Sequence, residues 1–188
     1  MQIISVINQK GGVGKTTSVI NLAAGLSHQN KKILVIDLDP QGNATTGLGL
    51  SNIDNSSETI YGVLNGTKEI IDVIKKTSFK NLDIITSNVD LSGLEVETAD
   101  DSNRAFLLKL KLTAYLNNSR GIYDYILIDC PPSLSLLTVM ALVCSNSLLV
   151  PLQTEFFALE GLTQLMKTIE RIKANLNPNL IIRGILLT

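Results

Sequence analysis

The chain contains 188 residues, of which 45% are hydrophobic and 18% are charged, and its formal net charge is −1. These values predict one globular domain that buries a full core, and they exclude an intrinsically disordered chain. The balanced charge gives no electrostatic sign of a nucleic-acid or membrane surface, and no apolar run reaches the roughly 18 to 20 residues of a membrane span. The N-terminus enters a strand without a basic region or cleavage site, so we expect no export signal and a cytoplasmic location.

Six short apolar runs are predicted as strands. Several consist almost entirely of Val, Ile and Leu, which is typical of parallel strands that are buried on both faces. The runs are 3–7, 33–38, 82–86, 125–130, 147–152 and 180–188. No helix follows the last run, so we expect that the chain is a single domain, 1–188, of a longer protein or that a partner covers this strand.

The segments between the runs have helical periodicity. We expect helices at 15–29, 58–64, 68–76, about 103–117, 134–144 and 157–176. Residues 43–58 are rich in Gly, Ser, Thr and Asn and are predicted as a loop. The alternation of strands and helices predicts an α/β fold with a doubly wound, mainly parallel sheet flanked by helices.

The first motif that carries chemistry is KGGVGKTT, residues 10–17, between the first strand and the first helix. Its glycines let backbone N–H groups turn inward and form an anion nest at the helix N-terminus. Lys15 is expected to reach the β- and γ-phosphates of a nucleotide, Thr16 to bind Mg²⁺ and Thr17 to reach the α-phosphate. The predicted nucleotide-binding residues are Lys10, Gly11, Gly12, Val13, Gly14, Lys15, Thr16 and Thr17.

This loop departs from the usual pattern G-x-x-x-x-G-K-[ST] at one position and carries a lysine that the pattern does not require. Gln9 stands where the first glycine is expected, and the loop carries an additional lysine, Lys10. Lys15 already serves the phosphates of the chain's own nucleotide, so the pattern itself leaves the role of Lys10 open.

Two carboxylates follow in DLDPQGN, residues 37–43, at the end of the second predicted strand. Because the side-chain period of a strand is two, Asp37 and Asp39 point to the same side, near the carboxyl edge where α/β folds bind ligands. We expect Asp39 to orient an attacking water and Asp37 to support the Mg²⁺ shell. A helix cap or turn aspartate is the alternative interpretation.

The third motif is ILIDCPPS, residues 126–133, an apolar strand that ends in an aspartate. This is the form of a Walker B strand, so Asp129 is predicted to hold Mg²⁺, generally through water. Pro131 and Pro132 impose an extended exit from the strand, which suits a segment that responds to the nucleotide.

The remaining reactive residues carry no motif. Cys130 and Cys144 belong to no C-x-x-C pair, and His28 is the only histidine, so we expect buried reduced thiols and a surface histidine rather than a zinc site or a disulfide. The lysine pairs at 31–32 and 75–76 are predicted to lie on solvated surfaces.

Together, KGGVGKTT, DLDPQGN and ILIDCPPS resemble the motifs of the deviant Walker A ATPases. Within that superfamily the chain is similar to the ParA/Soj branch, which segregates chromosomes and plasmids, and PLQTEFFALEGLTQL, residues 151–165, favours this branch. The resemblance covers essentially the whole chain. It implies ATP and Mg²⁺ as cofactors, an ATP-dependent homodimer, non-specific DNA binding, a nucleoid-associated location, no membrane, and hydrolysis stimulated by a ParB-like centromere-binding partner.

The resemblance also implies roles for single residues. Lys10 would cross the interface of the dimer and contact the partner's nucleotide, and Gly11 would occupy a position that tolerates no bulk. Asp39 would be the aspartate linked to hydrolysis, while Lys15, Thr16 and Asp129 keep the roles given above. The family continues beyond residue 188 with a segment that contacts adenine and DNA, so we expect those determinants outside this chain.

The motifs leave three alternatives open. A MinD-like membrane-associated cell-division ATPase would need a C-terminal amphipathic helix. An electron-transfer protein similar to the nitrogenase iron protein would need cysteines in glycine-rich loops, whereas Cys130 and Cys144 fall in a predicted strand and helix. A metabolic enzyme of the ligase or phosphoryl-transfer type would need a pocket for a further substrate.

Overall fold

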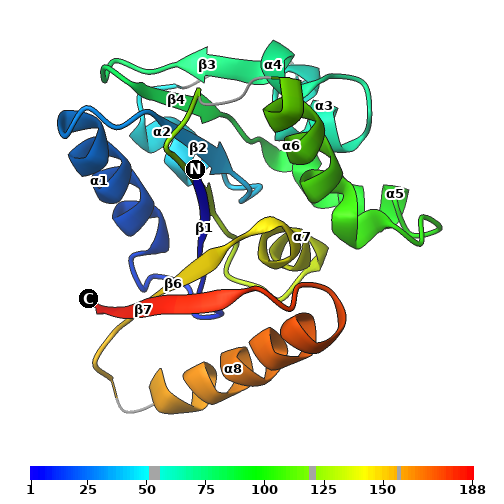
Figure 1. The fold of residues 1–188 in the computed structure, drawn as a ribbon. Coiled ribbons are helices and arrows are strands. Elements are labelled where there is room, and N and C mark those ends of the chain that lie inside the picture. The colour runs from blue at the N-terminus through cyan, green and yellow to red at the C-terminus, as the bar shows by residue number, and fades with distance from the viewer. Residues whose placement is uncertain (51–55, 119–121, 156–157) are drawn as a thin grey trace.

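A computed structural model describes residues 1–50, 56–118, 122–155 and 158–188. Within these ranges the strands form one seven-stranded sheet in the order β3-β4-β2-β5-β1-β6-β7, with helices on both faces (Figure 1). The strands are β1 (Gln2–Val6), β2 (Ile33–Asp37), β3 (Ile74–Lys76), β4 (Leu82–Ile85), β5 (Tyr125–Asp129), β6 (Ser147–Leu152) and β7 (Ile181–Leu187). Only the β3–β4 pair is antiparallel among the strands described, so the predicted doubly wound, mainly parallel α/β fold is confirmed.

The helices connect the parallel strands in sequence order. They are α1 (Lys15–His28), α2 (Asn43–Gly47), α3 (Ile60–Leu64), α4 (Ile70–Val73), α5 (Leu94–Glu97), α6 (Leu107–Asn118), α7 (Leu136–Cys144) and α8 (Ala158–Asn175). Short 3-10 turns occupy Ser56–Glu58, Val89–Gly93 and Arg104–Phe106. Among the described residues no helix is both long and apolar enough to cross a bilayer.

The central strands are buried on both faces. In β2, Val35 packs on the side of α1, while Leu34 and Ile36 pack on the opposite side against α3, α6 and α7 (Figure 1). A third cluster joins β6 to α7 and α8 through residues such as Leu165 and Ile169. Each fully buried aliphatic side chain contributes about 1.5–3 kcal/mol, which explains why these strands are almost continuously hydrophobic.

Two local predictions are wrong. Residues 74–76 were predicted as the end of a helix, but they form β3. A capping box between Glu69 and Asp72 starts α4, yet the backbone becomes extended at Ile74 and pairs with β4. Cross-strand pairing therefore outweighs the local helical pattern.

The predicted loop at 43–58 also contains structure. It begins with α2, which follows Gly42 in the left-handed conformation (φ 64°). Residues 51–55 of that predicted loop lie outside the described residues. The other predicted strands and most predicted helices are confirmed within a few residues at their ends.

β7 lies at one edge of the sheet and pairs in parallel with β6. Its apolar side chains are largely exposed; they are Ile181, Ile182, Ile185, Leu186 and Leu187. The strand predicted at 180–188 is thus confirmed as β7.

Candidate functional site

The carboxyl ends of β1, β2 and β5 border one cavity of about 550 Å³. Parallel strands end at a common edge, so motifs that are far apart in the sequence meet there. The lining residues are Gly11, Gly12, Gly14, Lys15, Thr16, Thr17, Ile20, Asp39, Gln41, Asn43 and Pro132. The structure therefore brings together the glycine-rich loop, the end of β2 and the segment after β5.

The loop at 10–17 has the backbone shape of an anion nest. Gly12 and Gly14 have φ values of 74° and 79°, a region that a residue with a Cβ atom rarely adopts. Gly14 directly precedes α1, and its carbonyl accepts the first hydrogen bond of that helix from Ser18 at 2.8 Å. The helix N-terminus consequently points its free N–H groups at the cavity.

Gly11 differs from these two glycines. Its φ lies outside the left-handed region, and a Cβ atom added there would meet no heavy atom within 4 Å. The packing of this chain therefore does not by itself require glycine at position 11.

The Lys15 side chain is drawn into the protein rather than into solvent. The residue is 7% exposed, and its Nζ donates a hydrogen bond to the Lys10 carbonyl at 3.1 Å. Burial lowers the pKa of Lys15, and the charges of Asp129 and Asp39 oppose that shift. Among the described residues it forms no ion pair, so this desolvated ammonium remains available to an anion.

Asp129 is a buried carboxylate without a hydrogen bond. It is fully buried, and neither of its oxygens has a partner among the described residues. Burial raises the pKa of Asp129 to about 7; the nearby Thr16 hydroxyl, which does not reach hydrogen-bond geometry, opposes that shift. Burying an ionised carboxylate costs free energy unless the charge is paired, so Asp129, together with the Thr16 hydroxyl, fits a bound divalent cation.

The described residues contain no group of three or more His, Cys, Asp or Glu side chains that could hold a metal ion alone. This does not conflict with Mg²⁺, which usually keeps several waters and uses one or two protein ligands plus phosphate oxygens.

Asp37 lies beside Asp129, because the two residues are directly paired in the β2–β5 register. Its Oδ2 accepts hydrogen bonds from both the N–H and the hydroxyl of Thr45 at 2.7 Å, and its Oδ1 accepts the Asp39 N–H at 3.2 Å. Burial raises the pKa of Asp37 to about 6. With both oxygens engaged, Asp37 fixes α2 to the end of β2 and fits a supporting position better than direct contact with a cation.

Asp39 lies at the strand exit and faces the cavity. It is 7% exposed, and its Oδ1 accepts the Gln41 N–H at 3.0 Å. Asp39 also lines an adjoining cavity of about 340 Å³ together with Pro131 and Pro132. The carboxylate is therefore held in place while still open to the space beside the loop.

Lys10 is held by a residue that the motifs did not indicate. Its ammonium forms an ion pair with Glu155 in the segment between β6 and α8, and both side chains are about half exposed (46% and 52%). In the same segment, Gln153 donates to the Gly12 carbonyl at 3.1 Å. Sequence reasoning used this segment only as a family marker and missed its contact with the loop; the opposite charges of Lys10 and Glu155 were the available signal.

Three further cavity residues had no predicted role: Ile20, Gln41 and Asn43. Gln41 and Asn43 belong to the quoted DLDPQGN motif, so their position near the phosphate loop could have been proposed from it. Ile20 lies one turn into α1, where an apolar side chain gives no signal of a ligand.

The other reactive residues behave as predicted. Cys130 and Cys144 are buried free thiols, and burial raises the pKa of both, that of Cys144 to about 12, so neither is a reactive thiolate. His28 is exposed at the end of α1. The functional groups around the cavity, among the described residues, are the carboxylates, the Lys15 ammonium and the threonine hydroxyls.

Comparison with known proteins gives the family. Residues 1–182 match the family described as an AAA domain. Over its full length the chain is 48% identical to the chromosome partitioning protein ParA of Caulobacter vibrioides and covers 69% of that protein. It is 47% identical over 187 residues to the sporulation initiation inhibitor protein Soj of Bacillus subtilis, covering 72% of it.

A solved structure gives the same architecture. Cobyrinic acid a,c-diamide synthase from Mycobacterium smegmatis, with a bound ATP analogue and magnesium, superposes with a TM-score of 0.92 at 35% identity. The match covers all of this chain and 72% of the synthase chain. On the identity to ParA and Soj over its whole length and the meeting of three motifs around one cavity, the chain belongs to the ParA/Soj family of partitioning ATPases.

Proposed function

We propose that this chain is an ATP-dependent DNA partitioning protein whose state of assembly is set by Mg²⁺-ATP in the 550 Å³ cavity. The proposal is supported mainly by two buried groups of opposite charge at this site, a carboxylate and an ammonium. Among the described residues, the buried Asp129 carboxylate has no hydrogen-bond partner and the buried Lys15 ammonium has no ion pair. A Mg²⁺-triphosphate satisfies both, and the synthase that shares this fold was solved with a bound ATP analogue and magnesium.

In this proposal each loop residue has one task. N–H groups of Gly11–Thr17 surround the phosphates, and Lys15 neutralises the charge of the β- and γ-phosphates. Thr16 and Asp129 hold the cation, with Asp37 as support. Mg²⁺, when bound, neutralises charge that develops on the phosphoryl oxygens. Asp39 orients the attacking water, which its position at the open strand exit allows.

We further propose that ATP joins two copies of the chain, with Lys10 serving the nucleotide of the partner copy. Two features support this. Lys10 is half exposed and does not line the cavity of its own chain, so it is free to reach outward once it leaves Glu155. Gly11 leaves open space beside the loop, which a second backbone could approach.

The proposed cycle follows the family. The ATP-bound dimer binds DNA without sequence preference. A ParB-like partner stimulates hydrolysis and releases the dimer, so the protein is cytoplasmic and associated with the nucleoid. The name of the Caulobacter vibrioides relative, chromosome partitioning protein ParA, supports the partitioning role.

The turnover assay that tests the proposal compares the wild type with Asp39→Ala. We expect slow ATP hydrolysis that DNA and the ParB-like partner increase together, and at least about a 100-fold loss of hydrolysis in the variant, because Asp39 is the group proposed to orient the water. ATP affinity should remain within about threefold, since Asp39 makes no predicted contact with the ground-state phosphates.

Asp100→Ala serves as the matched control, because Asp100 is an exposed aspartate away from the cavity. Wild-type hydrolysis in Asp39→Ala would move the water-orienting role to another residue. If DNA and the partner do not change the rate of ATP hydrolysis, the partitioning function is contradicted, whereas the ATPase activity is not.

A second experiment separates the two lysines of the loop. Lys10→Ala should bind ATP normally but lose ATP-dependent dimers and turnover, as measured by light scattering of the full-length protein. Glu155→Gln should favour dimers, by up to about threefold in the dimer dissociation constant, because an exposed ion pair holds Lys10 only weakly. Lys173→Ala, on the exposed face of α8, is the control. Full-strength dimers from Lys10→Ala would overturn the role in the partner's site.

The structural similarity to cobyrinic acid a,c-diamide synthase suggests a ligase-type enzyme as the alternative function. Such an enzyme would consume ATP only in the presence of a small carboxylic acid and a nitrogen donor. ATP consumption that instead follows DNA and the partner protein separates the two functions.

A further inference from the structure

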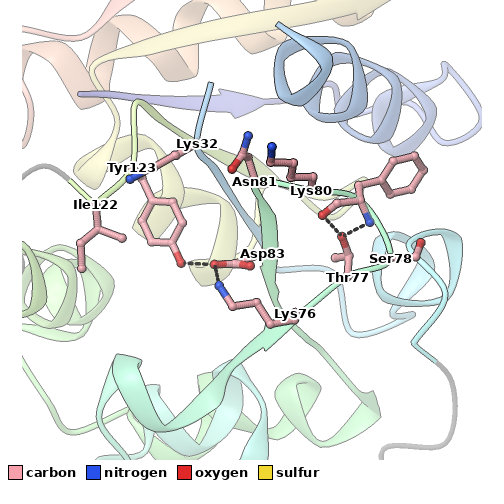
Figure 2. Close-up of a pocket in the computed structure, with 10 residues that line it drawn as sticks. Lys32, Lys76, Thr77, Ser78, Lys80, Asn81, Asp83, Ile122 and Tyr123 are labelled. Atoms are coloured by element: carbon pink, nitrogen blue, oxygen red, sulfur yellow. Dashed lines mark hydrogen bonds and ion pairs between the residues drawn. The ribbon is translucent and has the colours of Figure 1, made fainter. Parts of the chain in front are cut away.

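Another cavity lies at the opposite edge of the sheet, where β2, β4 and β5 begin (Figure 2). Its volume is about 490 Å³, within the range of small-molecule sites. The lining residues are Lys32, Lys76, Thr77, Ser78, Phe79, Lys80, Asn81, Asp83, Ile122 and Tyr123. The phosphate loop lies at the carboxyl edge of the same sheet, so this cavity is separate from the proposed nucleotide site.

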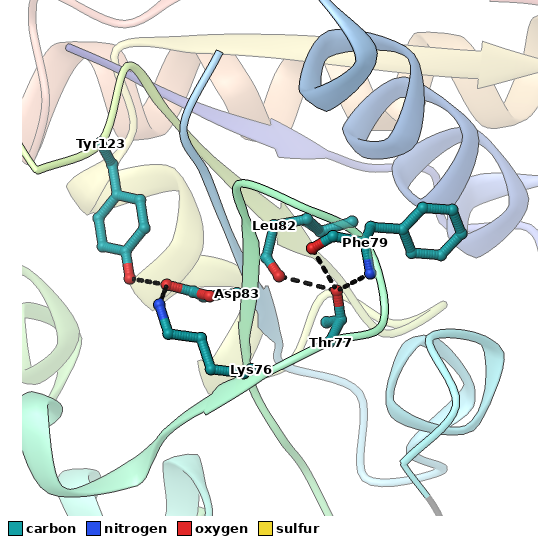
Figure 3. A network of polar contacts seen from close by, with 6 residues as sticks. All are labelled: Lys76, Thr77, Phe79, Leu82, Asp83 and Tyr123. Atoms are coloured by element: carbon teal, nitrogen blue, oxygen red, sulfur yellow. Dashed lines mark hydrogen bonds and ion pairs between the residues drawn. The ribbon is translucent and has the colours of Figure 1, made fainter. Parts of the chain in front are cut away.

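The floor of the cavity is a buried polar network. Asp83 and Tyr123 are only 6% and 7% exposed, and the Tyr123 hydroxyl donates to Asp83 Oδ2 at 2.6 Å (Figure 3). Lys76 Nζ contacts the same oxygen at 2.8 Å, from the position directly opposite Asp83 in the β3–β4 ladder. Asp83 is thus neutralised by its own partners, and the floor is held in one arrangement.

One wall is the turn between β3 and β4, and its shape is fixed by hydrogen bonds. The Thr77 hydroxyl accepts the Phe79 N–H at 3.1 Å and donates to the Leu82 carbonyl at 2.8 Å (Figure 3). Asn81 has a φ of 64°, the left-handed conformation that asparagine tolerates in turns. The turn therefore presents Lys80 and the 38% exposed ring of Phe79 on a defined backbone.

The charge at this cavity is not balanced. Lys76 is paired with Asp83, but neither Lys32 nor Lys80 forms an ion pair with any residue that the structure describes. Two free ammonium groups therefore border a concave surface in a chain whose net charge is −1. Concave surfaces lined by one sign of charge concentrate ions of the opposite sign.

We propose that this cavity binds a small organic phosphate. The dianionic phosphate lies between Lys32 and Lys80, and the organic part of the same molecule packs against Ile122, which is 41% exposed. Lysine ammonium groups bind phosphate as point charges, and the apolar side chain gives the rest of the ligand a surface to cover. The prediction that the lysine pairs lie on solvated surfaces holds for Lys31, Lys32 and Lys76, which are exposed, and Lys32 and Lys76 also line this cavity.

The experiment is a titration of the isotopically labelled chain with phenyl phosphate, followed by amide NMR. We expect the largest shifts at residues 77–81 and at Tyr123. Lys32→Gln and Lys80→Gln should each weaken binding by about threefold to fivefold, as for exposed charge pairs. Lys31→Gln is the matched control, because Lys31 is an exposed neighbour of Lys32 that does not line the cavity, and it should leave binding unchanged.

Further probes separate the parts of the ligand and its possible sources. Inorganic phosphate should bind at the same residues but more weakly than phenyl phosphate, and phenol more weakly still. Shifts confined to residues 10–17, or binding that Lys32→Gln and Lys80→Gln leave intact, would overturn the proposal. A response to duplex DNA without any response to phenyl phosphate would also overturn it, in favour of a nucleic-acid contact.

Discussion

Lys15→Ala is expected to weaken ATP binding by at least about 100-fold. The lysine is the desolvated cation that the structure places beside the phosphate loop, with its Nζ 3.1 Å from the Lys10 carbonyl. Hydrogen bonds to charged groups contribute about 1.5–3 kcal/mol each, and this ammonium is predicted to contact two phosphates. Isothermal titration calorimetry with Mg²⁺-ATP measures the effect directly.

The variant should remain folded, because its methyl group fills part of the space that the lysine stem occupied and no ion pair is lost among the described residues. Lys109→Ala, an exposed lysine on α6, is the control for the loss of one positive charge. ATP affinity that survives in a folded Lys15→Ala protein would show that the motif has been placed in the wrong register, with the phosphates elsewhere in the cavity.

The sequence was informative where residue type and backbone geometry coincide. Gly12 and Gly14 adopt conformations that favour glycine, so the loop could be located from its letters alone. Asp129 ends β5 and Asp39 follows β2, and parallel strands end at one edge of the sheet, so their position near the loop followed from the order of the elements.

The sequence was less informative where a contact joins segments through their side chains. Nothing local links Glu155 to Lys10 across 145 positions, and the pair exists because β6 lies next to β1 in the sheet. β3 was mistaken for helix because its three residues gain their ladder only by pairing with β4. The cavity at Lys32 and Lys80 depends on that same hairpin, so it could not be predicted before the hairpin was known.

The final prediction is that Asp129→Asn raises the stability of the folded chain but lowers its ATP hydrolysis. The folded chain holds the proton of Asp129 with a pKa of about 7, against a usual value of 3.8. The contribution of protonated Asp129 to the free energy of unfolding is therefore complete below about pH 4 and is lost as the pH rises through about 7. Between pH 5 and pH 8 the nucleotide-free wild type should lose about 3 kcal/mol through this group.

An asparagine does not ionise, so the variant should lack this part of the pH dependence. Without nucleotide at pH 8 it should be more stable than the wild type by about 2–4 kcal/mol in urea unfolding, while its Mg²⁺-dependent ATP hydrolysis falls by at least about 100-fold. Asp37, whose pKa is also raised to about 6, should leave a smaller pH dependence in both proteins, and Asp100→Asn should behave as the wild type. Equal pH dependence in Asp129→Asn and the wild type would mean that Asp129 is paired in solution. In that case its unsatisfied oxygens could not be the reason why the cavity attracts a cation.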